Sequence, residues 1–279
     1  MSLGKISTRF ADIESICDRD AIDSYLNSPL VSFEEAIVPI NNLVPGIAQY
    51  AATAKLLSTA PADSLTEEES AAIYLYTMDS PLYGKLNSVM RSTHINHLKP
   101  YFLYLKLFCT ALRKLPSEKA TVWRGIRANI SSTYVKGNYI VWHSPSSGST
   151  DASVVTNFLD KNSKCTLFQI DCRYGRSISK YSAFPTENEI LLMPGTKLLV
   201  RNNPLQFNGF QLVQLEETVN PNLKKMLTVL PNIIKSTAIT KVTLNSAEVK
   251  LTTETLNPKV VLPAIKTATV EQVKNDNCE

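Results

Sequence analysis

The sequence changes character at Pro116, and this change limits the folds that the chain can adopt. The residues from about 10 to Pro116 carry helix signals, whereas short β-rich runs separated by turn residues follow. Helices first and strands second are typical of an α+β fold. We therefore predict a helical N-terminal subdomain over residues 1–118, a β-rich core over 119–220 and an appended segment over 221–279, part of it strand.

Two helices of the first part have recognisable ends. The run Thr66-Glu-Glu-Glu69 has the pattern of a capping box, and the helix body follows in Ala71–Tyr76. Pro100 suits the first turn of a second helix over Tyr101–Leu115, which Pro116 ends. Because this second helix is apolar on nearly all sides, we expect it to be buried between other elements.

The β-rich part predicts a series of strands and one helix. The strands are expected at Thr121–Ile126, Asn138–Trp142, Cys165–Cys172, Glu189–Met193, Lys197–Val200 and Phe210–Leu215. The helix is expected over residues 152–160, with Thr150 or Asp151 as its N-cap. The last segment has no arginine or aromatic residue, and it predicts a hairpin about Asn245-Ser246.

Composition excludes several ways of holding a ligand. Only 9 of the 279 residues are glycine, against a usual share of roughly 7%, and no glycine-rich phosphate motif occurs. The net charge of +4 is spread thinly along the chain, which argues against a nucleic-acid partner. The five cysteines form no C-x-x-C pair and are expected to be free thiols. His94 and His97 lack a third candidate ligand, so no metal site is predicted.

Targeting and membrane signals are also missing from the sequence. The first residues contain no apolar region typical of a signal peptide. The most apolar stretch, Tyr101–Leu112, is too short to span a bilayer and contains Lys106. We therefore expect a soluble protein with no membrane span, either in the cytoplasm or secreted as an effector.

Three features of the β-rich part carry candidate chemistry. Arg124 lies inside the apolar run Val122–Ile126, where a guanidinium must be paired or must bind an anion, because an isolated buried charge is too costly. The serine-rich run Ser144–Thr150 is typical of a loop that caps a helix. Glu187 and Glu189 lie two residues apart, so their side chains share one face if the strand begins by Glu187. Two like charges on one face destabilise a scaffold, which favours a site.

The order and spacing of these features resemble the arginine-specific mono-ADP-ribosyltransferases, whose site combines an arginine, a serine and a Glu-x-Glu motif. The matching pieces are Val122-Trp-Arg-Gly-Ile126, Ser147-Gly-Ser149 and Glu187-Asn-Glu189, with further similarity at Leu65–Glu69, Ala72–Thr77, Tyr83–Asn87 and Thr196–Glu217. The resemblance covers roughly residues 60–217. It implies a helical subdomain packed on a mixed β-sandwich that binds NAD.

On the NAD side, the resemblance implies a role for each matching residue. Arg124 binds the pyrophosphate and the adjoining ribose, with Gly125 beside it at the cofactor. Ser147 holds Glu189 in place and shapes the nicotinamide pocket, and Ser149 also lies at the cofactor. Glu189 hydrogen-bonds the 2′-hydroxyl of the nicotinamide ribose, where a fixed carboxylate stabilises the oxocarbenium charge that develops on bond cleavage.

On the acceptor side, the resemblance implies that Glu187 pairs with the guanidinium of an incoming arginine. Glu187 can also take up a proton as the new bond forms. Tyr181 and Phe184, in the loop just before, are expected to flank the substrate. NAD is then a substrate, no metal is required, and the partner is a protein that presents an arginine.

Several alternatives stay open at this point. The family pattern is broken at Gly148, which leaves Ser146 as an alternative to Ser147. A serine hydrolase using His143 and Asp151 is a weaker hypothesis, because the motif G-x-S-x-G is absent. An NAD glycohydrolase, in which water replaces arginine, and a catalytically silent module that binds NAD or a protein are the other candidates.

Overall fold

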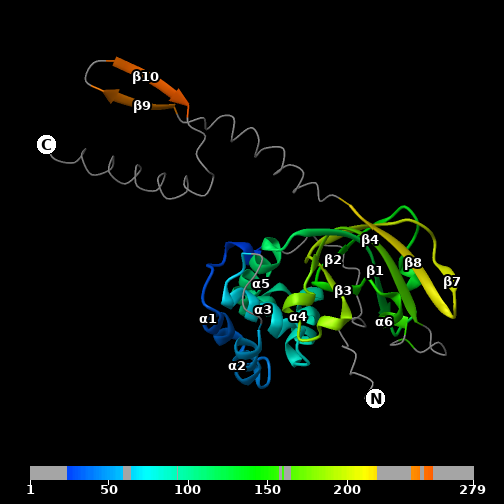
Figure 1. The fold of residues 1–279 in the computed structure, drawn as a ribbon. Coiled ribbons are helices and arrows are strands. Elements are labelled where there is room, and N and C mark those ends of the chain that lie inside the picture. The colour runs from blue at the N-terminus through cyan, green and yellow to red at the C-terminus, as the bar shows by residue number, and fades with distance from the viewer. Residues whose placement is uncertain are drawn as a thin grey trace. The chain divides into compact units, whose positions relative to one another are not determined.

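The computed structural model describes residues 24–58, 64–92, 94–156, 159, 165–218, 240–245 and 248–253. The chain divides into two compact units, residues 1–219 and 220–279. In the first unit helices come first and a sheet follows, as Figure 1 shows, so the predicted α+β fold is confirmed. In the second unit, β9 (Thr240–Asn245) and β10 (Glu248–Thr253) pair antiparallel, where the sequence predicts a hairpin.

The helical half of the first unit is built from short helices. Its α-helices are α1 (Phe33–Ile37), α2 (Ile47–Leu57), α3 (Glu67–Thr77), α4 (Pro81–Arg91) and α5 (Phe102–Lys114), and its 3-10 helices are η2 (Ser24–Asn27), η3 (Val38–Ile40) and η4 (Ile95–Tyr101). α3 begins with the predicted capping box. The Glu69 N–H donates to Thr66 Oγ1 at 3.2 Å, and the Thr66 N–H donates to Glu69 Oε2 at 2.8 Å.

Helix α5 contributes most of its length to the core of the helical half. Its buried side chains are those of Tyr104, Leu105, Leu107, Phe108, Cys109, Ala111 and Leu112, as the sequence predicted. The same core also includes Ile178, Tyr181 and Leu191, which come from the sheet half. Helices and sheet therefore share one apolar core, and the division at residue 118 stays a prediction.

The sheet half contains eight strands in one sheet. They are β1 (Ser117–Ile126), β2 (Tyr139–Trp142), β3 (Ser146–Ser149), β4 (Thr166–Ser177), β5 (Glu189–Leu192), β6 (Thr196–Val200), β7 (Leu205–Phe207) and β8 (Phe210–Glu217), with η5 (Ser131–Thr133), α6 (Ala152–Thr156), η6 (Ser179–Tyr181) and η7 (Pro185–Glu187) between them. The order is β1-β3-β5-β4-β8-β6-β2, β7 pairs with β8, and β1 also pairs with β4. The four strands β1, β3, β5 and β4 thus close on one another.

The serine-rich run is where the structure differs most from the prediction. Residues Ser146–Ser149 form strand β3 instead of a loop, and all four are buried. Serine and glycine have low strand propensity, but β3 lies between two partners, because it pairs with β1 on one side and β5 on the other. Tertiary pairing therefore overrides the local preference.

Candidate active site

Strands β3 and β5 bring the predicted serine and glutamate residues together. Ser149 lies directly opposite Glu189, and Ser147 lies opposite Leu191. Ser149 also lies opposite Trp123 of β1. Side chains alternate along a strand, so Ser147, Ser149 and Glu189 leave the sheet on the same face. This is the arrangement that a site built from both motifs requires.

Ser147 has a buried hydroxyl that the protein does not satisfy. The side chain is 2% exposed, and its Oγ has no hydrogen-bond partner among the described residues. The neighbouring Ser146 hydroxyl donates to the carbonyl oxygen of Ser144 at 3.1 Å, within its own segment. A buried polar atom without a partner is unfavourable unless a ligand or water meets it. These contacts favour Ser147 over Ser146 as the serine of the site.

Ser149 joins the serine strand to the turn that carries Glu187. Its hydroxyl donates to the carbonyl oxygen of Glu187 at 2.8 Å and accepts from the N–H of Asp151 at 3.1 Å. Both bonds are to main-chain atoms, so Ser149 contacts the backbone of this turn and not the Glu187 carboxylate. Ser149 therefore fixes the backbone geometry of the site.

The two glutamates lie in different local structures. Glu189 is the first residue of β5 and is 0% exposed, whereas Glu187 ends the 3-10 helix η7 and is 6% exposed. Asn188 between them adopts φ 47° and ψ 48°, in the left-handed region. The sequence predicted a shared face for the two side chains only if the strand began by Glu187. Strand β5 begins at Glu189, so this condition is not met. A shared face cannot be inferred for the two side chains from strand alternation.

Arg124 holds the serine strand from the other face of β1. Its guanidinium is 1% exposed, and Nη1 donates to the carbonyl oxygen of Ser147 at 2.8 Å. The Cζ atom lies 5.9 Å from the ring centroid of Trp142, within the range of a cation–π contact. Val122 and Ile126, which share the face of Arg124 by alternation, belong to the same buried cluster as Trp142.

Gly125 has a packing role in the structure. A Cβ atom at this position would lie 2.6 Å from Leu159 Cδ1 and 2.9 Å from Val155 Cγ1. Val155 belongs to α6, so the missing side chain lets this helix pack against β1. The role of Gly125 at NAD stays a prediction.

The residues expected at the acceptor differ in exposure. Tyr181 is 1% exposed and belongs to the core shared with the helices. Phe184 is partly exposed in the same loop. Tyr181 is thus placed to support this loop, whereas Phe184 is accessible to a substrate.

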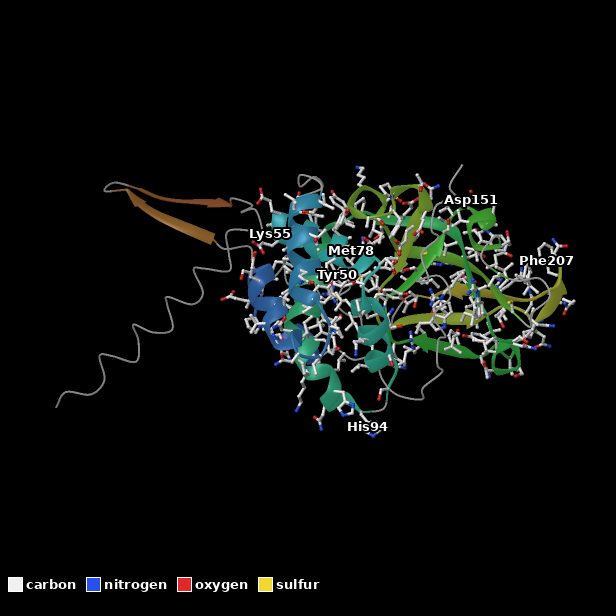
Figure 2. All side chains as sticks on the ribbon, turned by 90° about the horizontal axis from the view of Figure 1, so that it is seen from below. Tyr50, Lys55, Met78, His94, Asp151 and Phe207 are labelled. Atoms are coloured by element: carbon white, nitrogen blue, oxygen red, sulfur yellow. The ribbon has the colours of Figure 1, made fainter. Side chains whose placement is uncertain are left out.

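The contacts of Asp151 oppose the hydrolase hypothesis. Asp151 is exposed, and its Oδ1 accepts from the N–H of Ser153 at 2.8 Å, which is the geometry of a helix cap. Hydrogen bonds from the side chain and the main chain of Ser153 lower the pKa of the Asp151 carboxyl. Figure 2 shows Asp151 on the sheet half of the first unit.

Tyr76 and Thr77 of the helical half contact the segments of the site, and Asn87 contacts Tyr76; the sequence assigned none of them a role. Tyr76 of α3 reaches the carbonyl oxygen of Pro145, next to β3, and Asn87 of α4 donates to the Tyr76 hydroxyl. Thr77 accepts from the N–H of Ala183. These residues lie in Ala72–Thr77 and Tyr83–Asn87, two stretches that resemble the family. That resemblance was the one sequence signal that pointed to them.

Metal and membrane features were searched in the described ranges. Across them, no group of three or more His, Cys, Asp or Glu side chains is placed to hold a metal ion. The rings of His94 and His97 stack on each other with centroids 5.6 Å apart. None of the described helices combines the length and apolar character needed to cross a bilayer.

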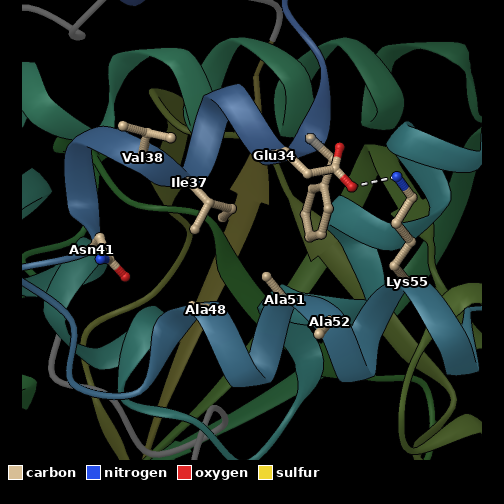
Figure 3. Close-up of a pocket in the computed structure, with 9 residues that line it drawn as sticks. Glu34, Ile37, Val38, Asn41, Ala48, Ala51, Ala52 and Lys55 are labelled. Carbon is tan, nitrogen blue, oxygen red and sulfur yellow. Dashed lines mark hydrogen bonds and ion pairs between the residues drawn. The ribbon is translucent and has the colours of Figure 1, made fainter.

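Two hollows of the helical half are not lined by the candidate site residues, which are Arg124, Ser147, Ser149, Glu187 and Glu189. One, of about 360 Å³, lies between α1 and α2 and is bordered by Ile37, Val38 and Ala51, with the Glu34–Lys55 ion pair at one end (Figure 3). The other, of about 580 Å³, lies beside α4 and η4. The site described above is thus separate from both.

Comparison with known proteins identifies the family of this chain. The family model described as NAD:arginine ADP-ribosyltransferase matches residues 47–219. NAD(P)(+)--arginine ADP-ribosyltransferase 2 of Gallus gallus is 28% identical over 138 residues, which are 47% of this chain and 43% of that protein. The chain therefore spans less than half the length of this relative.

Solved structures of similar proteins include two bacterial examples. The Vis toxin, an ADP-ribosyltransferase from Vibrio splendidus, is 20% identical with a TM-score of 0.49, over 81% of this chain and 99% of that one. ADP-ribosyltransferase HopU1 of Pseudomonas syringae is 20% identical with a TM-score of 0.48, over 75% of this chain and 94% of that one. Since the family model covers more than half of its residues, the chain belongs to the NAD:arginine ADP-ribosyltransferase family.

Proposed function

We propose that this chain transfers ADP-ribose from NAD to the arginine side chain of a protein and releases nicotinamide. The observation that carries the proposal is the row formed by Ser149 and the fully buried Glu189, with the unsatisfied Ser147 hydroxyl on the same face. A carboxylate held at the buried start of β5 can stabilise the oxocarbenium ion that forms when the glycosidic bond of NAD breaks.

The reaction replaces the bond between C1′ and nicotinamide with a bond between C1′ and the acceptor arginine. The bond between C1′ of the ribose and the nicotinamide nitrogen breaks, and its electron pair neutralises the pyridinium nitrogen. A guanidine nitrogen of the acceptor arginine then bonds to C1′ and loses one proton. The products are the ADP-ribosylated guanidinium, nicotinamide and a proton, so charge and atoms balance.

Glu189 and Ser147 act on the NAD side of this reaction. Glu189 accepts from the 2′-hydroxyl of the nicotinamide ribose and stabilises the positive charge that develops at C1′. The Ser147 hydroxyl, which has no hydrogen-bond partner among the described residues, is proposed to bind NAD on the nicotinamide side. Arg124 and Ser149, with Gly125 beside them, complete this side. The buried Arg124 guanidinium donates to the carbonyl oxygen of Ser147, which joins Arg124 to the serine strand.

Glu187 acts on the acceptor side. It pairs with the incoming guanidinium and takes up the proton that this group loses on bond formation. Its place in a turn after the partly exposed Phe184 supports this role, because an acceptor protein must approach from outside. Tyr181 supports the same turn from the core.

The test uses purified protein, NAD labelled in its adenylate part, and agmatine as the guanidino acceptor. We expect labelled acceptor and free nicotinamide in equal amounts. Nicotinamide release without labelled acceptor, repeated with an arginine-rich protein, would overturn the transferase proposal in favour of an NAD glycohydrolase. NAD binding with no release would instead favour the silent module.

A further inference from the structure

The helical half makes hydrogen bonds to both segments that carry the site. The Tyr76 hydroxyl donates to the carbonyl oxygen of Pro145 at 3.2 Å, one residue before β3. The next residue on α3, Thr77, accepts at its Oγ1 from the N–H of Ala183 at 2.9 Å, in the loop that leads to Glu187. Neighbouring residues of one helix thus bind the serine segment and the glutamate loop separately.

Tyr76 is held so that its hydroxyl meets Pro145. The side chain is 0% exposed, and its ring stacks on Phe108 of α5 with centroids 4.6 Å apart. The Asn87 Nδ2 donates to the same hydroxyl at 3.1 Å, and Asn87 is 4% exposed. The hydroxyl therefore accepts from α4 and donates to the serine segment. The Asn87 Oδ1 is a second, more distant acceptor for this hydroxyl at 3.5 Å. A buried polar network that is satisfied in this way adds rigidity to its surroundings.

Thr77 is held in a similar way. It is 0% exposed, and its own hydroxyl hydrogen goes to the carbonyl oxygen of Tyr74 at 2.8 Å. With the hydrogen directed into the helix, the oxygen lone pairs face the N–H of Ala183. Because Ala183 lies four residues before Glu187, this bond limits where the glutamate turn can lie relative to α3.

We propose that Tyr76, with Asn87, and Thr77 are positioning residues that set the two sides of the reaction independently. Tyr76 fixes the entry of β3 and thereby the Ser147 hydroxyl beside Glu189, so it acts on NAD cleavage. Thr77 fixes the loop that ends in Glu187, so it acts on capture of the arginine. The inference rests on the proposed transferase function, because it assigns NAD cleavage to the Tyr76 contact and arginine capture to the Thr77 contact.

Isosteric variants test the division. Tyr76→Phe should lower nicotinamide release and arginine transfer equally, by about 10- to 100-fold, the effect of small displacements on catalysis. Thr77→Val should lower transfer to agmatine by about 10-fold or more and change release to water by less than about 3-fold. Thr77→Ser keeps the hydroxyl and should restore transfer.

Two control variants come from helix α5. Tyr104 is also 0% exposed and stacks on Phe108, but its hydroxyl donates to the carbonyl oxygen of Ala72 within the helical half. The Thr110 hydroxyl donates to the carbonyl oxygen of Lys106 within α5. Tyr104→Phe and Thr110→Val should therefore keep both rates near those of the unmodified chain.

The outcomes separate the two proposals. Equal losses in the test and control variants, or a Thr77→Val variant that loses both activities together, would overturn the division of roles. If the unmodified chain transfers nothing, the proposed function fails, and amide hydrogen exchange then decides the positioning. Faster exchange at residues 146–149 in Tyr76→Phe alone, and at 183–189 in Thr77→Val alone, supports it; unchanged exchange refutes it.

Discussion

The hydroxyl of Ser149 donates to the main-chain oxygen of Glu187 at 2.8 Å, across 38 positions of the sequence. The same serine lies opposite Glu189 in the register of β3 and β5. Ser149 thus contacts the backbone of Glu187 and lies opposite Glu189 in the sheet. It joins the two motifs through the main chain, and substitutions of the glutamate side chains leave this connection in place.

Replacing Glu189 should impair every reaction that cleaves NAD. Glu189→Gln keeps the size of the buried side chain but removes the charge that stabilises the oxocarbenium ion. We expect both nicotinamide release and arginine transfer to fall by about 10²–10³ in kcat. Measurement of both rates on the same preparation tests this. A variant that keeps normal release would show that Glu189 is not the stabilising carboxylate.

Replacing Glu187 should separate transfer from hydrolysis. Glu187→Gln leaves Glu189 and the NAD side unchanged, and the Ser149 bond remains because it goes to the main chain. We therefore expect lower transfer to agmatine, with a higher KM for the acceptor, while release of nicotinamide to water is retained. An equal loss of both activities would contradict the division of roles between the two glutamates.

Several elements of the fold could be predicted from the sequence, because their signals are local. The capping box of α3 and the apolar run around Arg124 identify their elements by themselves. The strand formed by Ser146–Ser149 could not be predicted, because its stability comes from pairing with β1 and β5 rather than from its own residues. The bonds from Tyr76 and Thr77 likewise join segments 69 and 106 positions apart, which no local pattern specifies.

The turn between the glutamates should depend on Asn188. Its φ of 47° lies in the left-handed region, which asparagine and glycine tolerate and β-branched residues do not. We expect Asn188→Gly to keep both activities and Asn188→Val to lose about 1–3 kcal/mol of unfolding free energy. Chemical denaturation with NAD-cleavage assays checks this. Equal stability of the two variants would exclude backbone strain as the constraint.

The glycine beside Arg124 should matter for packing. Gly125→Ala places a Cβ atom 2.6 Å from Leu159 Cδ1, so we expect a loss of about 1–3 kcal/mol of unfolding free energy. Gly84, inside α4, is the matched control, because a Cβ there meets nothing within 4 Å. Gly84→Ala should stabilise the protein by about 0.5–1 kcal/mol. Thermal unfolding of both variants gives the comparison, and destabilisation by Gly84→Ala would invalidate it.

Stability should fall at high pH because of a buried thiol. Burial raises the pKa of Cys109 from 9.0 to about 11. Below pH 9 the thiol is protonated in both the folded and the unfolded chain, so it adds no pH dependence. Above pH 9 the unfolded chain loses this proton first, which favours unfolding until the folded thiol also ionises near pH 11.

The fall in unfolding free energy follows from the difference between the pKa of Cys109 in the unfolded and in the folded chain. Between pH 8 and pH 11, the free energy of unfolding should fall by about 2 kcal/mol more in the unmodified chain than in Cys109→Ala. The alanine variant starts from a lower stability because it leaves a cavity, but that loss does not depend on pH. Denaturation curves at each pH compare the slopes, and parallel slopes would show that Cys109 ionises normally in the folded state.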